Sequence, residues 1–223
     1  MAALSTQQIA FYETFGYLKL PALFKEEIAD ITEGFEQIFA DDRNVKIPLD
    51  AELHRNEPRL MIAQFIDKHP TLAALRHDPR VVGIVDSLFP NGWQYAESDG
   101  NLYWCDSEWH CDIYFAPMEI RHVKVALYLD DLDSDNGAVR LMPGTNHWQT
   151  DYARTLRRTF QNFGQIPTTF GVDGPEIPCT IVDSTPGDLI IWDMRTIHAA
   201  YFGRERRRLF TLNFREAVPE STA

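Results

Sequence analysis

The chain has 223 residues, which is enough for one domain with a substantial core and too few for two comfortable ones. Hydrophobic residues make up 44% and aromatic residues 12% of the sequence, which indicates a folded globule rather than a disordered protein. The net charge of −12 and the pI near 4.9 disfavour general binding to nucleic acid or to an anionic membrane, because both reward basic surfaces.

The sequence also predicts a compartment. No stretch approaches the roughly 20 apolar residues that cross a bilayer, and no basic residue precedes Lys19, so we expect neither a membrane span nor a signal peptide. Three scattered cysteines form neither a disulfide framework nor a CxxC zinc motif. These features predict an enzyme of the reducing cytoplasm and leave its oligomeric state open.

The first part of the chain, about residues 1–92, has helical patterns. Ser5 and Gln8 fit a capping box for a helix that ends near Phe15, and Gly16 stops it. A short strand at Tyr17–Leu20 precedes a second amphipathic helix that carries apolar residues from Ile28 to Phe39.

Two short helices are expected further on, at about residues 69–75 and 79–89. The charged segment 41–57, which prolines interrupt, is expected to be a mobile loop and a candidate lid over an active site. We expect all these helices to pack on the outside of a sheet.

From about residue 93 to 216 the pattern changes to short strands separated by turns. The expected strands are Trp93–Ala96, Leu102–Trp104, His110–Phe115, Val123–Leu129, Ala138–Leu141, Thr180–Val182, Leu189–Trp192 and Leu209–Phe214. This number of short strands predicts a mainly β fold with flanking helices, built as a sandwich or a barrel. Residues 143–178 form a long insert, partly helical around 151–160, in which Arg154, Arg157 and Arg158 are interpreted as a solvated helix face.

The expected strand 110–115 carries the most suggestive side chains. Residues two apart in a strand point to the same face, so His110 and Asp112 can reach one point in space. His198 follows the apolar strand 189–192, and Arg207 comes nine residues later. Two imidazoles and one carboxylate on one side of a metal form the facial triad typical of non-haem Fe(II) oxygenases.

The chain resembles the phytanoyl-CoA dioxygenase (PhyH) family of Fe(II)- and 2-oxoglutarate-dependent oxygenases over almost its whole length. The matching pieces are Phe11–Leu18 of the FxxxGY type, Trp109–Asp112, Leu129–Asp131, Asn136–Ala138, Pro143–His147, Pro186–Asp188, His198 and Arg207. Each piece alone is weak, but the set in this order is fairly specific. The resemblance implies a double-stranded β-helix, the cupin-like jelly roll, in a single oxygenase domain spanning residues 1–223.

The same resemblance implies a role for each site residue. His110, Asp112 and His198 would hold Fe(II), and Arg207 would bind the distal carboxylate of 2-oxoglutarate, with Arg208 as the alternative. Tyr103 and Ser107 would add hydrogen bonds to this cosubstrate. The family often has a polar residue two positions after the second histidine, where this chain has Ala200, so part of the usual contact must be absent or supplied differently.

The expected activity is hydroxylation of a small or medium-sized metabolite with dioxygen, releasing succinate and carbon dioxide. Related halogenases need a small residue at the carboxylate position, so Asp112 disfavours halogenation, whereas desaturation and cyclisation stay open. Two other classes remain: a non-catalytic metal-binding jelly-roll protein, and a cupin-type metalloenzyme that does not use 2-oxoglutarate. The intact triad with its arginine favours the oxygenase over both.

Other polar residues have structural interpretations. Asp188 is expected to accept backbone N–H bonds in a turn before a buried strand. The carboxylates at 130, 131 and 133 precede Asn136–Gly137, a strong hairpin signal, and calcium binding is disfavoured because the EF-hand spacing is absent. The remaining histidines, at 54, 69, 77, 122 and 147, are not predicted ligands.

Overall fold

The computed structural model describes residues 3–43, 58–113, 117–160, 166–203 and 206–218. The helices are α1 (Thr6–Phe15), α2 (Ile28–Arg43), η2 (Ile66–Lys68), α3 (Pro70–Ala74), η3 (Leu75–His77), α4 (Pro79–Leu88), α5 (Asp151–Phe160), α6 (Ile166–Phe170) and η5 (Gly174–Glu176). The strands are β1 (Tyr17–Leu20), β2 (Arg59–Ala63), β3 (Trp93–Tyr103), β4 (Ser107–His110), β5 (His122–Tyr128), β6 (Val139–Leu141), β7 (Thr180–Val182), β8 (Leu189–Asp193), β9 (His198–Ala200) and β10 (Arg207–Glu216).

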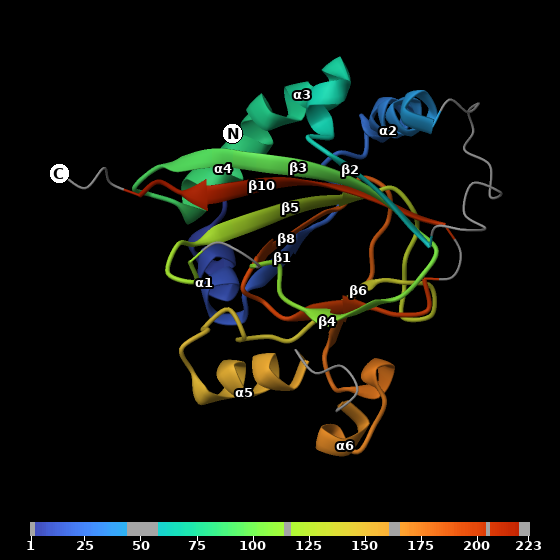
Figure 1. Cartoon of the computed structure of the whole chain (residues 1–223). Helices are drawn as coiled ribbons and strands as arrows, with labels where there is room; N and C mark the ends of the chain where they lie inside the picture. The colour runs from blue at the N-terminus through green and yellow to red at the C-terminus, as the bar shows by residue number, and fades with distance from the viewer. Residues whose placement is uncertain (1–2, 44–57, 114–116, 161–165, 204–205, 219–223) are drawn as a thin grey trace.

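Two antiparallel sheets face each other and form the core of the molecule (Figure 1). The larger sheet has six strands in the order β1-β8-β5-β10-β3-β2, and the smaller has four in the order β4-β9-β6-β7. The fold is mainly β with flanking helices, as the strand pattern predicted, and it is the jelly roll that the family resemblance implied.

Side chains alternate across the larger sheet, and this alternation creates its two faces. Along β5, Val123, Val125 and Leu127 belong to a core that also contains residues of α1, α2, α3 and α4, and Figure 1 shows α2, α3 and α4 over the outer face. Ala126 and Tyr128 of the same strand belong to a second cluster between the two sheets. Apolar residues therefore cover the outer face, whereas the inner face is free to carry polar groups.

The predicted helices are present, although α2 continues to Arg43, and η2, α6 and η5 were not expected. Ser5 and Gln8 form the capping box of α1, and Gly16 ends the helix with a left-handed φ of 84°. The predicted short helices correspond to α3 with η3 and to α4. The expected turn at Asp188 is also confirmed, because its carboxylate accepts the backbone N–H groups of Ala22 and Thr185.

The strands differ from the prediction in several respects. The two strands expected between residues 93 and 104 are one long strand, β3, and the sequence reading missed β2 and β9. The hairpin expected at Asn136–Gly137 is wrong, because this turn joins β5 to β6 and the two strands belong to different sheets. A turn signal cannot distinguish a hairpin from a crossing between sheets, since both need the same backbone conformation.

The long insert covers the outer side of the smaller sheet with α5. Trp109 of β4 stacks on Phe160 with ring centroids 5.7 Å apart. The interpretation of the α5 arginines as a solvated face holds for Arg154, which is exposed, but not for Arg157, whose guanidinium donates to the carbonyls of Thr145 and Arg195. Arg157 therefore anchors the helix.

The predicted lid loop is wrong at residues 41–43, which form the end of α2, and its remaining residues, 44–57, lie outside the described part of the chain. Among the helices that the structure describes, none combines the length and the apolar character that crossing a membrane requires.

Candidate active site

The two predicted histidine ligands lie at facing ends of two paired strands. His110 is the last residue of β4 and His198 the first residue of β9, and they are directly opposite each other in the pairing. Their ring centroids are 4.3 Å apart. One donor atom of each histidine and one carboxylate oxygen of Asp112 all lie within 4.8 Å of one another.

Asp112 reaches this cluster by a different route from the one expected. The predicted strand 110–115 is wrong as far as the structure describes it, because β4 ends at His110 and Asp112 lies beyond it. The backbone N–H of Asp112 instead donates to the carbonyl of Met194 at 2.9 Å. A loop contact across the sandwich, and not strand alternation, brings the carboxylate beside the two imidazoles.

The hydrogen bonds of both histidines leave the same ring nitrogen free. Nδ1 of His110 lies 2.6 Å from the carbonyl oxygen of Glu108, and Nδ1 of His198 lies 3.0 Å from that of Thr196. A carbonyl can only accept, so each Nδ1 carries the proton and each Nε2 keeps its lone pair. These Nε2 atoms lie 3.8 Å and 3.5 Å from the Asp112 carboxylate.

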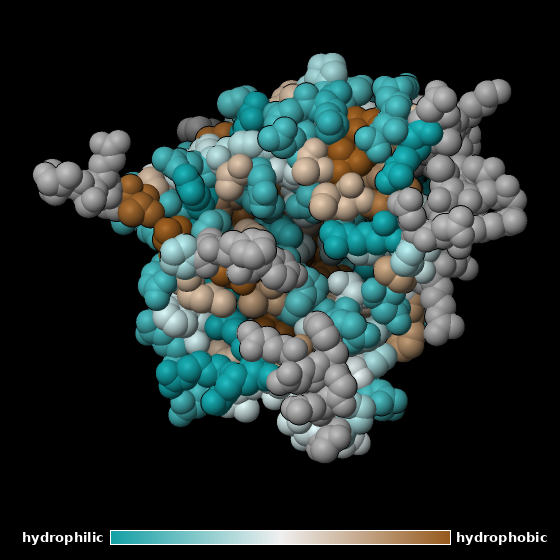
Figure 2. Space-filling view, in the orientation of Figure 1, coloured by the Kyte–Doolittle hydropathy of each residue, from teal (hydrophilic) through white to brown (hydrophobic). Residues whose placement is uncertain are grey.

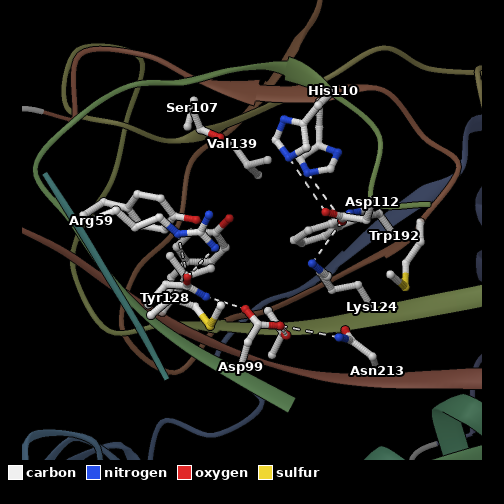
Figure 3. Close-up of a pocket in the computed structure, with 18 of the residues that line it drawn as sticks. Arg59, Asp99, Ser107, His110, Asp112, Lys124, Tyr128, Val139, Trp192 and Asn213 are labelled. Carbon is white, nitrogen blue, oxygen red and sulfur yellow. Dashed lines mark hydrogen bonds and ion pairs between the residues drawn. The ribbon is translucent and has the colours of Figure 1, made fainter. Parts of the chain in front are cut away.

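The Asp112 carboxylate is held from behind by two donors (Figure 3). Its Oδ2 accepts from Trp192 Nε1 at 3.1 Å and lies 3.1 Å from the ammonium of Lys124. Burial alone would raise the pKa of Asp112, but Lys124 and then the two histidines hold it well below its usual value. Asp112 is therefore an anion whose position the protein fixes.

The charge state of His198 completes the donor set. Burial lowers the pKa of His198 to about 4, against the opposing effect of Asp112. A neutral imidazole at this position, a second imidazole with a free Nε2 and a fixed carboxylate provide three ligand atoms of the type that non-haem iron sites use. The described residues thus fit a divalent metal ion.

Strand alternation separates the two candidate arginines. Arg207 lies on the inner face of β10, lines the cavity and is 3% exposed. Arg208 points to the outer face, where its guanidinium pairs with Asp130 and with Glu36 of α2. Arg208 thus forms its ion pairs within the protein, whereas Arg207 forms none with any residue that the structure describes.

The guanidinium of Arg207 keeps donor capacity that the protein does not use. Its Nη1 donates to the carbonyl of Gly137 at 2.9 Å, and its plane lies over the ring of Tyr103 at 4.5 Å. Its Nε is buried and has no partner among the described residues. A buried donor without a partner is costly, so this side of the guanidinium fits a carboxylate ligand.

A cavity of about 360 Å³ lies between the two sheets, and all the predicted site residues line it. Figure 2 shows this face of the molecule hollowed between polar side chains. Tyr103 and Ser107 line the cavity, and Ser107 of β4 pairs directly with Ala200 of β9. The hydroxyl of Ser107 is therefore available beside the position at which Ala200 offers none.

Several cavity residues were missed by the sequence analysis: Asp99, Asn101, Lys124, Tyr128, Trp192, Thr211 and Asn213. Lys124 carried a usable signal, because it is the one charged residue inside the apolar stretch 123–129. Tyr128 lies two residues from Ala126 on the same face of β5. Burial raises the pKa of Tyr128 to about 12.

These features define a jelly-roll protein with a His-Asp-His cluster and an arginine in one cavity. The sequence matches the family model described as phytanoyl-CoA dioxygenase (PhyH) over residues 12–204, and the chain belongs to this family. No protein with a curated functional description matched the sequence.

Several solved structures share this fold. The 2-oxoglutarate-dependent carbocyclase SnoK of nogalamycin biosynthesis has 21% identity and a TM-score of 0.72, with 96% of this chain and 85% of SnoK covered. EctD from S. alaskensis has 19% identity and a TM-score of 0.68, with 96% and 77% covered. HygX from Streptomyces hygroscopicus, solved with nickel and 2-oxoglutarate, has 16% identity and a TM-score of 0.71, with 96% and 88% covered.

Proposed function

We propose that this protein is a single-domain Fe(II)- and 2-oxoglutarate-dependent dioxygenase that hydroxylates a small or medium-sized metabolite. The observation that carries the proposal is the convergence of His110, Asp112 and His198, with both Nε2 atoms free, in a cavity that also holds Arg207. Iron(II), 2-oxoglutarate and dioxygen bound there would supply the oxidising power to break a substrate C–H bond, with release of succinate and carbon dioxide.

The roles of the residues follow from their contacts. His110, Asp112 and His198 would hold the metal on one face and leave the opposite face open. Trp192 and Lys124 would keep the Asp112 carboxylate oriented towards it. Arg207 would fork onto the distal carboxylate of the cosubstrate.

Tyr103 and Ser107 would complete the cosubstrate site. Tyr103 packs its ring under the Arg207 guanidinium and fixes the direction in which this group points. Ser107 lies opposite Ala200 and would replace the polar contact that Ala200 lacks. Both side chains line the same cavity as the metal cluster.

Anaerobic titration tests the metal and cosubstrate sites directly. Protein with Fe(II) and 2-oxoglutarate together is expected to develop the weak visible charge-transfer band of the chelated cosubstrate, and neither addition alone should produce it. His110→Ala should abolish the band. Arg207→Ala should require at least tenfold more 2-oxoglutarate, whereas Arg208→Ala, if it folds, should not. A folded wild-type protein that gives no band at any concentration would overturn the proposal.

The kind of oxidation needs a separate experiment. The neighbouring structures include a carbocyclase and an epimerase, which shows that this fold carries more than one reaction. Mass spectrometry of the product distinguishes them, since hydroxylation adds one oxygen atom, cyclisation or desaturation removes two hydrogens and epimerisation leaves the mass unchanged. Addition of one oxygen from labelled dioxygen is the expected outcome.

We also propose a reducing compartment, the cytoplasm, as the place of action. Cys105, Cys111 and Cys179 are all free thiols in the structure. Free cysteines are usual where glutathione and thioredoxin keep thiols reduced.

A further inference from the structure

One cavity wall carries a carboxylate that the proposed iron and cosubstrate sites do not use. Asp99, on the inner face of β3, accepts a hydrogen bond from Thr211 Oγ1 at 2.6 Å and another from Nδ2 of Asn101. Nδ2 of Asn213 lies 3.5 Å away (Figure 3). All three neighbours are uncharged, and Asp99 forms no ion pair with any residue that the structure describes.

This carboxylate is fixed in place and keeps capacity for a ligand. Thr211 and Asn213 are at most 2% exposed, so their side chains have little freedom. An ionised carboxylate offers about four acceptor positions, and at most three are used here. Because Asp99 is half-buried and lines the cavity, a donor entering the cavity can reach it. In such a partly dehydrated site, a cation gains more from the carboxylate than it would in water.

The groups around Asp99 also favour a donor as the ligand. Glu97, two residues along the same face of β3, is exposed at the cavity and has no partner among the described residues. The Oδ1 atom of Asn213 is buried without a hydrogen bond. Of the nearby cations that line the cavity, Lys124 of β5 is paired with Asp112, and Arg59 of the adjacent strand β2 donates to Asn101 Oδ1 and not to Asp99. The wall therefore presents two carboxylates, Asp99 and Glu97, that form no ion pair with any described residue, together with an unsatisfied amide oxygen.

The strand register relates this wall to the proposed iron site. Thr211 of β10 pairs with Asp99 of β3, and Asn213 of β10 pairs with Lys124 of β5. Lys124 in turn contacts Asp112. Asp99 thus lies two strands away from the strand that carries Lys124, or about 10 Å between backbones. A small molecule that docks one end on Asp99 can present a carbon a few bonds away to the metal.

We propose that the substrate carries a protonated amine, and that the ammonium group docks on Asp99 while the rest of the molecule extends towards His110, Asp112 and His198. The role as a substrate site rests on the proposed function, but the binding of amines does not need iron. The wall formed by Asp99 and Glu97 then selects the substrate class, and the metal end of the cavity performs the oxidation.

Ligand-observed NMR on the metal-free protein tests this selection with three probes of equal length: hexylammonium, 1-hexanol and hexanoate. Hexylammonium is expected to bind at least tenfold more tightly than 1-hexanol, and hexanoate more weakly still. Asp99→Asn should weaken hexylammonium binding at least tenfold without improving 1-hexanol binding. Glu97→Gln, further out, should weaken it twofold to threefold. Asp131→Asn, which removes the same charge from an exposed residue outside the cavity wall, should have no effect.

The comparison of hexylammonium with 1-hexanol on the wild-type protein tests the proposal even if Asp99→Asn does not fold. Equal binding of hexylammonium and 1-hexanol, or no binding of hexylammonium, would overturn the proposal. Undiminished amine binding by a folded Asp99→Asn protein would also overturn it. The charge-transfer band reports separately on the iron site, so a protein that gives the band but does not prefer amines refutes only the substrate class. The reverse result refutes only the oxygenase.

Discussion

The two faces of the six-stranded sheet are built from alternating residues of the same strands, yet their chemistry is opposite. On the outer face of β10, Phe210, Leu212 and Phe214 pack under the helices, and the charged Arg208 is paired with carboxylates. On the inner face, Arg207 and Thr211 line a cavity, and the guanidinium of Arg207 has no anionic partner among the described residues. The outer face therefore stabilises the fold, whereas the inner face keeps its binding capacity for ligands.

The largest expected effect comes from one substitution made on each face of the same strand. Leu212→Ala removes a side chain that is 0% exposed in the outer core and should lower the free energy of unfolding by about 3–5 kcal/mol. Leu209 borders the cavity and is 8% exposed, so Leu209→Ala enlarges an existing cavity and does not create a new one. It should therefore lower the free energy of unfolding by at least about 1 kcal/mol less than Leu212→Ala. Urea unfolding of both variants measures the difference, and equal losses would contradict the comparison.

A second prediction concerns the inner face of β8. Trp192→Phe keeps an aromatic ring but removes the N–H that donates to Asp112 Oδ2. We expect iron affinity to fall about 10- to 100-fold, as for other residues that orient metal ligands. Equilibrium dialysis with Fe(II) under anaerobic conditions measures the loss. Trp104→Phe is the matched control, since Trp104 packs against the helix-side core, and it should leave iron affinity unchanged.

A third, smaller effect is expected at Gly137, whose carbonyl accepts a hydrogen bond from Arg207. Gly137 has a φ of 110°, which a residue with a side chain rarely adopts, and an added Cβ would lie 3.3 Å from Arg207 Cδ. Gly137→Ala should weaken 2-oxoglutarate binding about tenfold, or about 1.4 kcal/mol. Gly203→Ala, where an added Cβ would lie 3.7 Å from Arg207 Cζ, is the control and should change binding by less than twofold. Titration of the charge-transfer band measures both.

A pH dependence of the metal-free protein is also expected. Burial lowers the pKa of His198 to about 4, from 6.5 in the unfolded chain. Between these values the unfolded chain binds a proton that the folded protein does not, so stability should fall as the pH drops from about 6.5 to about 4. The contribution of His198 is at most about 1.4 kcal/mol per pH unit. In His198→Asn, urea unfolding should show a shallower decrease, and an unchanged slope would exclude His198 as the source.

The outer face and the helices could be predicted from the sequence because local signals determine them. The Ser5 cap, the stop at Gly16 and the apolar alternation of residues 123–127 each act over a few positions. The two histidines and Asp112 were also identified as candidates, but the reason given for their convergence was wrong. The contact of Asp112 with the Met194 carbonyl joins residues 82 positions apart, and no local pattern encodes such a contact.

The inner face was harder to predict, because its function depends on which strands become neighbours. Asp99 appears in the sequence as one acidic residue among many. It becomes distinctive only when β10 lies beside β3 and brings Thr211 and Asn213 to it. The same limitation left open whether Arg207 or Arg208 binds the cosubstrate. Packing decides which of two adjacent residues in a strand points to the inner face, and the sequence of two arginines does not show it.

Because Arg207 and Arg208 are adjacent, a one-residue shift in the register of β10 would still place an arginine in the cavity. If the strand slipped by one residue, Arg208 would enter the cavity as Arg207 left it, and a guanidinium would remain at the cosubstrate end. Further along, the slip would replace Thr211 and Asn213 with Leu212 and Phe214, and Asp99 would lose the two hydrogen-bond donors that β10 supplies. An insertion or deletion in β10 could thus preserve cosubstrate binding while abolishing recognition of the substrate, so homologues that retain the arginine need not share a substrate class.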